Sequence, residues 1–160
     1  MEKRKVSIGI VTFNKIRFLP DCFKSIFQQT YPDIEVTAVD NNSRDGSPDF
    51  IRKNYPRIKL IRNSENLGFS YAQNQAIQNS DGEFYLSLNQ DAILTPTCVE
   101  ELVKAMQVDS SVGIAAGKIY HLDNDFIIKE SLNTLDSTGL YLTRNVRHFD
   151  RGSGEIDRGQ

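Results

Sequence analysis

The chain has 160 residues, of which 39% are hydrophobic and 25% charged, a composition typical of a soluble globular domain with a real core. Its 19 Lys and Arg residues nearly balance 21 Asp and Glu residues, and the formal net charge of -2 argues against a nucleic-acid binder with a basic surface. No apolar run approaches the roughly 18 residues of a membrane span, and polar residues interrupt the apolar stretch near the start, so we expect no transmembrane segment, no export and a cytoplasmic location.

Short segments rich in β-branched residues alternate with segments of helical periodicity from residue 6 to residue 120. The pattern predicts five strands, over residues 6–12, 34–40, 58–61, 84–88 and 112–120. It predicts helices between them: one from about residue 19 to the break at 31–33, then 47–54, 68–79, and one that opens at Thr95-Pro96. Such alternation is typical of right-handed βαβ units, so we expect an α/β fold with a mostly parallel central sheet flanked by helices.

The regular alternation stops after Tyr120, and residues 121–160 carry only scattered apolar residues among polar ones. The sequence therefore predicts a division into residues 1–120 and residues 121–160. Cys22 and Cys98 lie in helical patterns and have no second ligand at metal spacing, so we interpret them as small buried hydrophobes. His121 and His148 are far apart in the sequence and are interpreted as surface residues.

Ligands of an open parallel sheet bind at the carboxyl ends of its strands. The predicted strand ends are all polar: Thr12-Phe13-Asn14, Asp40-Asn41-Asn42-Ser43, the loop 63–68, and Asn89-Gln90-Asp91. Asn and Asp also form turns and cap helices, and for Asn41 to Ser43 this structural role is an equal alternative. Two strand ends that both carry Asp favour a binding site.

No glycine-rich phosphate loop is present, neither G-x-G-x-x-G nor G-x-x-x-x-G-K-[ST], so the sequence predicts neither a dinucleotide fold of that type nor a P-loop ATPase. A nucleotide diphosphate bound without such a loop needs another source of positive charge. A divalent cation, Mg²⁺ or Mn²⁺, on the carboxylate of Asp91 would supply it. No G-x-S-x-G motif indicates nucleophilic hydrolysis.

Five strings resemble the family 2 glycosyltransferases with the GT-A fold and occur in the same order: VSIGIVTFN, QQTYPDIEV, VDNNSRDGS, NSENLGFSYAQNQAI and GEFYLSLNQDAIL. The later stretch LDSTGLYLTRNVRHFDRGSGE is similar to the continuation found in the rhamnosyltransferase-like branch. The resemblance implies a Rossmann-like nucleotide-diphospho-sugar transferase fold. It also implies that residues 1–120 form the donor-binding half and that residues 121–160 begin an incomplete acceptor-side region.

The resemblance implies roles for the ends of the first two strands. Thr12 and Phe13 would line the pocket of the donor's base, with Phe13 where the family often has a tyrosine, and Asn14 belongs to the same loop. Asp40 would accept a hydrogen bond from the ring N–H of a pyrimidine, with Asn42 beside it.

Three further positions follow from the same resemblance. Gly68 and Asn74 match the loop and helix that close over the nucleotide. Asn89-Gln90-Asp91 stands at the D-x-D position, where Asp91 would bind the metal. Asn89 replaces the first acid and so gives a cation less charge.

The implied reaction is transfer of a sugar, with inversion, from a nucleotide-diphosphate sugar to an acceptor hydroxyl. The resemblance of the tail suggests dTDP-rhamnose as donor, a saccharide or lipid-linked acceptor, and a role in cell-surface polysaccharide or glycan synthesis. A lipid-linked acceptor would place the protein peripherally at the inner membrane face. No acid matches the family's catalytic base, which we expect beyond Gln160. Two alternatives stay open: a non-catalytic nucleotide-sugar-binding domain or fragment, and a sugar nucleotidylyltransferase, although the glycine- and arginine-rich first loop of the latter is missing.

Overall fold

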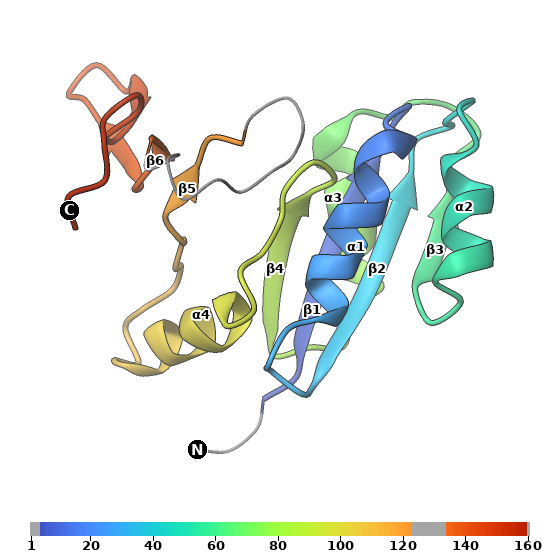
Figure 1. Ribbon diagram of the computed structural model, residues 1–160, viewed down its shortest axis with the longest axis horizontal. Helices are drawn as coiled ribbons and strands as arrows, with labels where there is room; N and C mark the ends of the chain where they lie inside the picture. Colours follow the sequence, from blue (N-terminus) through green and yellow to red (C-terminus); the bar gives the residue numbers. More distant parts are fainter. Residues whose placement is uncertain (1–3, 123–133, 160) are drawn as a thin grey trace. The chain divides into compact units, whose positions relative to one another are not determined.

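A four-stranded parallel sheet is the centre of the first of two compact units, Met1–Val103 and Lys104–Gln160. The computed structural model describes residues 4–122 and 134–159 (Figure 1). The strands lie in the spatial order β3 (Lys59–Arg62), β2 (Ile34–Asp40), β1 (Val6–Thr12) and β4 (Phe84–Asn89). All three strand pairs are parallel, which confirms the predicted α/β class.

Helices cover both faces of this sheet because the side chains of each strand alternate between two apolar layers. Ile8 and Ile10 belong to the layer formed with α1 (Leu19–Phe27), α2 (Ser47–Asn54) and α4 (Cys98–Gln107). Val11 and Val39 face the other side, where α3 (Phe69–Gln78) contributes Ala72 and Ala76. Figure 1 shows α1 in front of the sheet and α3 behind it. A 3₁₀ turn, η1 (Ile16–Phe18), precedes α1.

A glycine in the middle of β1 makes room for an aromatic ring. A Cβ atom built on Gly9 would lie 1.7 Å from the hydroxyl oxygen of Tyr85 and 2.5 Å from its Cζ atom. The Tyr85 hydroxyl donates a hydrogen bond of 2.7 Å to Gln73 Oε1, and the Gln73 amide in turn donates to Ser87 Oγ. Burial raises the pKa of Tyr85 to about 12. The ring is therefore held in place over Gly9 from the α3 side.

The fifth predicted strand, over residues 112–120, is wrong. Only β5 (Ile119–Tyr120) is a strand, and it pairs antiparallel with β6 (Leu135–Ser137) outside the four-stranded sheet. Gly113 and Gly117 weaken a strand in this segment, and Ile114 is 90% exposed, so its apolar composition does not correspond to burial. The predicted bounds of β1, β2 and α2 are confirmed, and those of β3, α3 and β4 are within one residue.

Helix α4 begins at Cys98, two residues after the predicted first position at Pro96. Its cap comes from another part of the chain: Gln29 Oε1 accepts the N–H of Val99 at 2.9 Å, and Gln29 Nε2 donates to the carbonyl of Thr95 at 2.7 Å. A glutamine that follows α1 thus satisfies the helix terminus that the sequence assigns to Thr95.

The second unit contains short antiparallel pairs, β5 with β6 and β7 (Leu140–Leu142) with β8 (His148–Asp150). Asp157, near the C-terminus, bonds to β5 and to the residue before it. Tyr120 Oη donates to Asp157 Oδ2 at 2.5 Å, and Lys118 Nζ lies 2.9 Å from Asp157 Oδ1. These bonds lower the pKa of Asp157 to about 2. The two compact units divide after Val103, whereas the sequence predicts a division after residue 120. The donor-binding role of residues 1–120 and the acceptor-side role of residues 121–160 stay predictions. Within the described ranges, no helix is long and apolar enough to cross a membrane.

A partly buried carboxylate at the amino end of the sheet, Glu35, predicts a pH-dependent stability. Glu35 Oε1 accepts from Ser7 Oγ at 2.5 Å and from the Asp81 N–H at 2.6 Å, and Oε2 lies 2.9 Å from Lys5 Nζ. Burial opposes ionisation of Glu35, but these three partners outweigh it and lower its pKa from 4.5 to about 2. The stabilisation is complete above the ordinary pKa and is lost as the pH falls toward the folded-state pKa.

We therefore expect the free energy of unfolding to fall by about 1–2 kcal/mol between pH 4.5 and pH 2 on account of Glu35, after allowance for solvent screening. Urea unfolding at several pH values measures this loss. Glu35→Gln should remove that part of the pH dependence, whereas Glu65→Gln, at an exposed position, should retain it. Equal pH profiles for wild type and Glu35→Gln would contradict the assignment.

Candidate functional site

The carboxyl ends of the four strands meet at one edge of the sheet, as the sequence predicts. Thr12 lies opposite Asp40 in the register of β1 and β2, and Asp40 lies opposite Arg62 at the end of β3. On the other side of β1, Val11 lies opposite Asn89. Polar residues from distant parts of the chain are therefore neighbours at this edge, where parallel sheets bind ligands.

Asp40 is the buried centre of the edge. Thr12 and Asp40 lie on the same face of their strands, so Thr12 Oγ1 donates to Asp40 Oδ1 at 2.9 Å, and the Ser43 N–H donates to Oδ2 at 3.0 Å. Asp40 and Thr12 are both 0% exposed. Each carboxylate oxygen retains a second lone pair for a further donor. A ligand would reach Asp40 only after the residues that cover it move.

A network of amides lies on the α3 side of the same edge. Asn41 Nδ2 donates to the carbonyl of Gly68 at 3.1 Å, and Asn63 Nδ2 donates to Asn41 Oδ1 at 2.8 Å. Asn63 and Gln75 exchange two further bonds of 2.8 and 2.9 Å. The network joins the ends of β2 and β3 to α3 and fixes the carbonyl of Gly68. Asn41 thus has a role in holding the loop before α3.

The loop after β1 is held by the loops after β2 and β4. The N–H of Phe13 donates to Gln90 Oε1 at 3.2 Å, and the N–H of Asn14 donates to Ser43 Oγ at 3.0 Å. Asn14 has φ of 50°, and its Oδ1 accepts the N–H of Arg44 at 2.8 Å. The Phe13 side chain itself stays 40% exposed. Its ring is consequently available to stack on a flat ligand.

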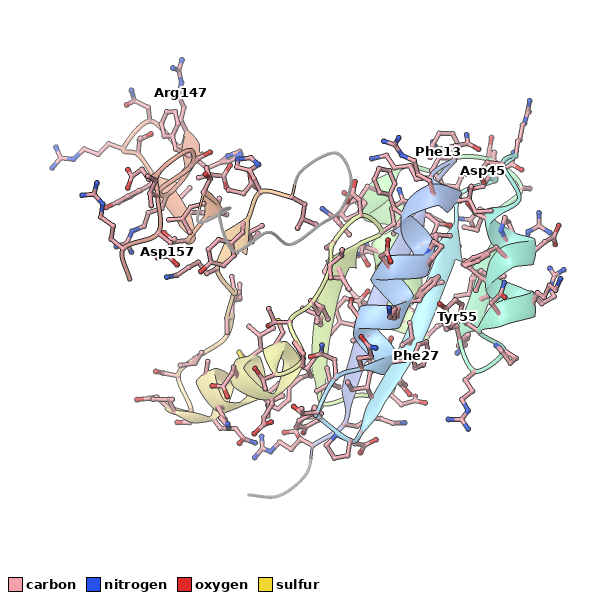
Figure 2. The ribbon with its side chains drawn as sticks, viewed as in Figure 1. Phe13, Phe27, Asp45, Tyr55, Arg147 and Asp157 are labelled. Carbon is pink, nitrogen blue, oxygen red and sulfur yellow. The ribbon has the colours of Figure 1, made fainter. Side chains whose placement is uncertain are left out.

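Asp45 holds the start of α2 and of η1 together. Its carboxylate accepts from the Ile16 N–H at 2.7 Å and from the Ser47 N–H and hydroxyl at 3.0 and 2.6 Å. Burial opposes ionisation of Asp45, but the bonds from Ser47 and Ile16 outweigh it and lower its pKa. Ser47 is the first residue of α2, and Gly46 is its N-cap. Figure 2 shows Asp45 and Phe13 at the same end of the sheet.

The segment after β4 presents one carboxylate and two amides. Asp91 Oδ2 lies 2.9 Å from Lys15 Nζ, and Gln90 is bonded to Phe13 as described. Asn89 is exposed, and its carbonyl lies 3.7 Å from the thiol of Cys22, whose pKa burial raises to about 12. Cys22 is buried, as predicted, whereas Cys98 is only partly buried.

A divalent cation would have Asp91 as its carboxylate ligand at this segment, and a substrate phosphate would complete its ligand set. Among residues 4–122 and 134–159, no three His, Cys, Asp or Glu side chains form a metal site. Mg²⁺, however, is commonly held by one or two carboxylates together with substrate phosphates. Asp91, partly exposed at the ligand-binding edge, fits a cation shared with a diphosphate.

The remaining predicted site residues lie in the loops at this edge and in α3. Asn42 follows Asp40 with φ of 64°, and Gly68 has φ of 83° in the loop before α3. Asn74 lies exposed in α3, and its neighbour Gln75 is the residue that joins the amide network. The predicted role of Asn74 in closing over a nucleotide stays a prediction.

Sequence reasoning did not assign functional roles to Lys15, Ser43, Asn63 and Gln75. Asn63 carries a usable signal, because it follows Ile61 by two residues and therefore continues the side of β3 that faces α3. Lys15 carries none, since its partner Asp91 is 76 residues away in the sequence.

Known proteins of one family are similar to this chain. The family model "Glycosyl transferase family 2" matches residues 7–156. GlyG, a glycosyltransferase of Streptococcus pneumoniae, is 26% identical over 121 residues, which cover 74% of this chain and 40% of GlyG. An uncharacterized glycosyltransferase of Nostoc sp. is 32% identical over 136 residues, which cover 82% of this chain and 40% of the relative.

Solved structures share the fold. The mannosyltransferase PcManGT from Pyrobaculum calidifontis, in complex with GDP-Man and Mn²⁺, matches with a TM-score of 0.66 at 26% identity over 71% of this chain and 35% of its own. TarS of S. aureus, in complex with UDP, matches with a TM-score of 0.60 at 22% identity over 64% of this chain and 32% of its own, a likeness of fold alone. This chain spans 40% of each of the two sequence relatives. The match of the family model over residues 7–156, together with the GT-A architecture, shows that the chain belongs to glycosyl transferase family 2.

Proposed function

We propose that the chain is the donor-binding part of a glycosyltransferase that transfers a sugar from a nucleotide-diphosphate sugar to an acceptor hydroxyl. One observation carries the proposal: a buried acceptor, Asp40, and a partly exposed carboxylate, Asp91, lie on the same ligand-binding edge of a parallel sheet. The complex of PcManGT with GDP-Man and Mn²⁺ supports a donor of this class.

The donor's base would lie against the loop after β1. Phe13 offers a ring on which a base can stack, and the Gln90 bond to its N–H fixes the backbone beneath that ring. Asp40, oriented by Thr12 and Ser43, would accept a ring N–H of the base with a lone pair that these two donors leave free, once the residues that cover it move. A buried acceptor of this kind discriminates strongly, because a ligand without the matching donor leaves it unpaired.

The diphosphate would lie near Asp91, on the neighbouring strand end. A bound Mg²⁺ or Mn²⁺ ion would supply Lewis-acid stabilisation of the charge on the leaving diphosphate. Asp91 would hold that cation, and Asn89 would contribute a neutral oxygen. Inversion at the anomeric carbon, the dTDP-rhamnose donor and a saccharide or lipid-linked acceptor rest on sequence resemblance. A peripheral place at the membrane rests on the same resemblance, and a cytoplasmic location stays an expectation from the sequence.

We propose no catalytic base among the described residues. In the second unit, Asp157 is bonded to Tyr120 and Lys118, and its lowered pKa makes it a weak proton acceptor. Asp136 lies 3.3 Å from His121 Nε2. The second candidate function is a domain that binds a nucleotide sugar without transferring it.

Calorimetric titration with UDP, GDP and dTDP, each with and without Mn²⁺, tests the proposal. We expect at least one of these nucleotides to bind when Mn²⁺ is present. Phe13→Ala should weaken its affinity about tenfold to hundredfold, because base–aromatic stacking contributes about 1–3 kcal/mol. Phe13→Tyr should retain affinity. The control Phe27→Ala removes an exposed ring that stacks on Tyr55 at 5.5 Å, toward the other end of the sheet (Figure 2).

Failure of the wild type to bind any of the three nucleotides in Mn²⁺ would contradict the proposed function. Equal losses for Phe13→Ala and Phe27→Ala would place the base elsewhere. Transfer activity, measured as nucleoside diphosphate release in the presence of an acceptor, separates the two candidate functions.

A further inference from the structure

Lys15 lies where a cation is needed for the proposed function. Its Nζ atom lies 2.9 Å from Asp91 Oδ2, and the two side chains are 47% and 36% exposed. The ammonium also lies 5.3 Å from the centroid of the Phe18 ring, an attractive cation–π distance. Lys15 is thus held in front of the carboxylate that would bind a metal.

Electrostatics make this ion pair easy to exchange. An exposed pair of this kind contributes at most about 1 kcal/mol. It is also neutral, so it offers a diphosphate no net attraction. With a divalent cation on Asp91 and the ammonium of Lys15 released, the same place carries a net charge of about +2. A lysine has a flexible four-carbon stem, so the released ammonium stays within reach of phosphate oxygens around the cation.

We propose that Lys15 is a diphosphate-binding residue that occupies Asp91 in the donor-free protein and turns to the donor's diphosphate when a divalent cation binds Asp91. This inference rests on the proposed function, since it takes the diphosphate from there. Lys15 therefore has two successive partners of negative charge: the carboxylate before the donor binds, and the phosphate oxygens afterwards.

Arg17 provides a matched control for Lys15. Its guanidinium carbon lies 4.4 Å from the centroid of the same Phe18 ring, so Arg17→Met removes the same charge from the same segment. Lys15→Met additionally removes the ammonium that lies against Asp91. A difference between the two variants therefore reports the contact with Asp91 and not the general charge of the loop.

The experiment measures two affinities for wild type, Lys15→Met and Arg17→Met. The first is the affinity for Mn²⁺ alone, followed by electron paramagnetic resonance. The second is the affinity for UDP, GDP and dTDP in saturating Mn²⁺, followed by calorimetry. For Lys15→Met we expect Mn²⁺ alone to bind about twofold to fivefold more tightly, and the nucleoside diphosphate about tenfold more weakly. For Arg17→Met we expect changes of less than about twofold in both.

The opposite signs distinguish exchange from a merely structural role, which would weaken both affinities. Unchanged or weaker Mn²⁺ binding by Lys15→Met overturns the proposal, as does unchanged nucleotide binding. If Mn²⁺ binds Lys15→Met but not wild type, the result supports the proposal that Lys15 occupies Asp91. If Mn²⁺ binds neither protein, the result counts against that proposal. If wild type binds Mn²⁺ but none of the nucleotides, the proposed function fails, and the comparison in Mn²⁺ alone still decides whether Lys15 competes at Asp91.

Discussion

Replacement of Asp40 by alanine is expected to lower the free energy of unfolding by about 2–5 kcal/mol. The substitution leaves the Thr12 hydroxyl and the Ser43 N–H without their acceptor in a fully buried place. Each unpaired buried donor costs about 1–3 kcal/mol. Urea unfolding followed by circular dichroism measures the change. Asp49→Ala is the control, because the Asp49 side chain is 79% exposed and pairs only with Arg52 three residues away in α2, among the contacts described.

Asp40→Asn separates stability from recognition. Its amide retains one acceptor for Thr12 but presents an N–H₂ group toward the Ser43 N–H, so we expect an intermediate loss of stability and a loss of nucleotide affinity greater than tenfold. If Asp40→Ala does not fold, Asp40→Asn still allows the contribution of Asp40 to nucleotide affinity to be measured. A stability of Asp40→Ala within about 0.5 kcal/mol of wild type would show that the hydrogen bonds at Asp40 are not needed.

Gly9→Ala is expected to cost about 2–4 kcal/mol, because the new methyl group would overlap the Tyr85 ring and break its bond to Gln73. Thermal and urea unfolding measure the loss. Gly113→Ala is the control, since a Cβ at Gly113 meets no atom within 4 Å. We expect Tyr85→Ala to cost less in the Gly9→Ala background than in wild type. Additive effects of the two substitutions would contradict the steric explanation.

The four-stranded sheet was predictable because its signals are local. β1 and β2 are short apolar runs whose side chains are buried on both faces of the sheet. Thr12 and Asp40 are the last residues of these runs, so the sequence alone locates them at the strand ends. Once the strands are known to be parallel, the meeting of these two residues at one edge follows from topology. The same reasoning correctly places Gln90 and Phe13 on neighbouring loops.

What was not predictable depends on partners distant in the sequence. The segment 112–120 has the composition of a strand, but only Ile119 and Tyr120 find a partner, and that partner is β6. The cap of α4 is supplied by Gln29, which is 70 residues from Val99. The amide network and the Lys15–Asp91 pair likewise join segments that no period of the sequence connects.

The alternation of β2 between two layers constrains its length as strictly as its composition. Asp40 belongs to the layer of α1, where Thr12 and Ser43 meet it, and Asn41 bonds toward α3. Insertion or deletion of a single residue within β2 would exchange these directions and set a carboxylate among amide partners. Length changes in evolution or in design should therefore fall outside β2, so that the spacing from Ile34 to Asn41 is kept.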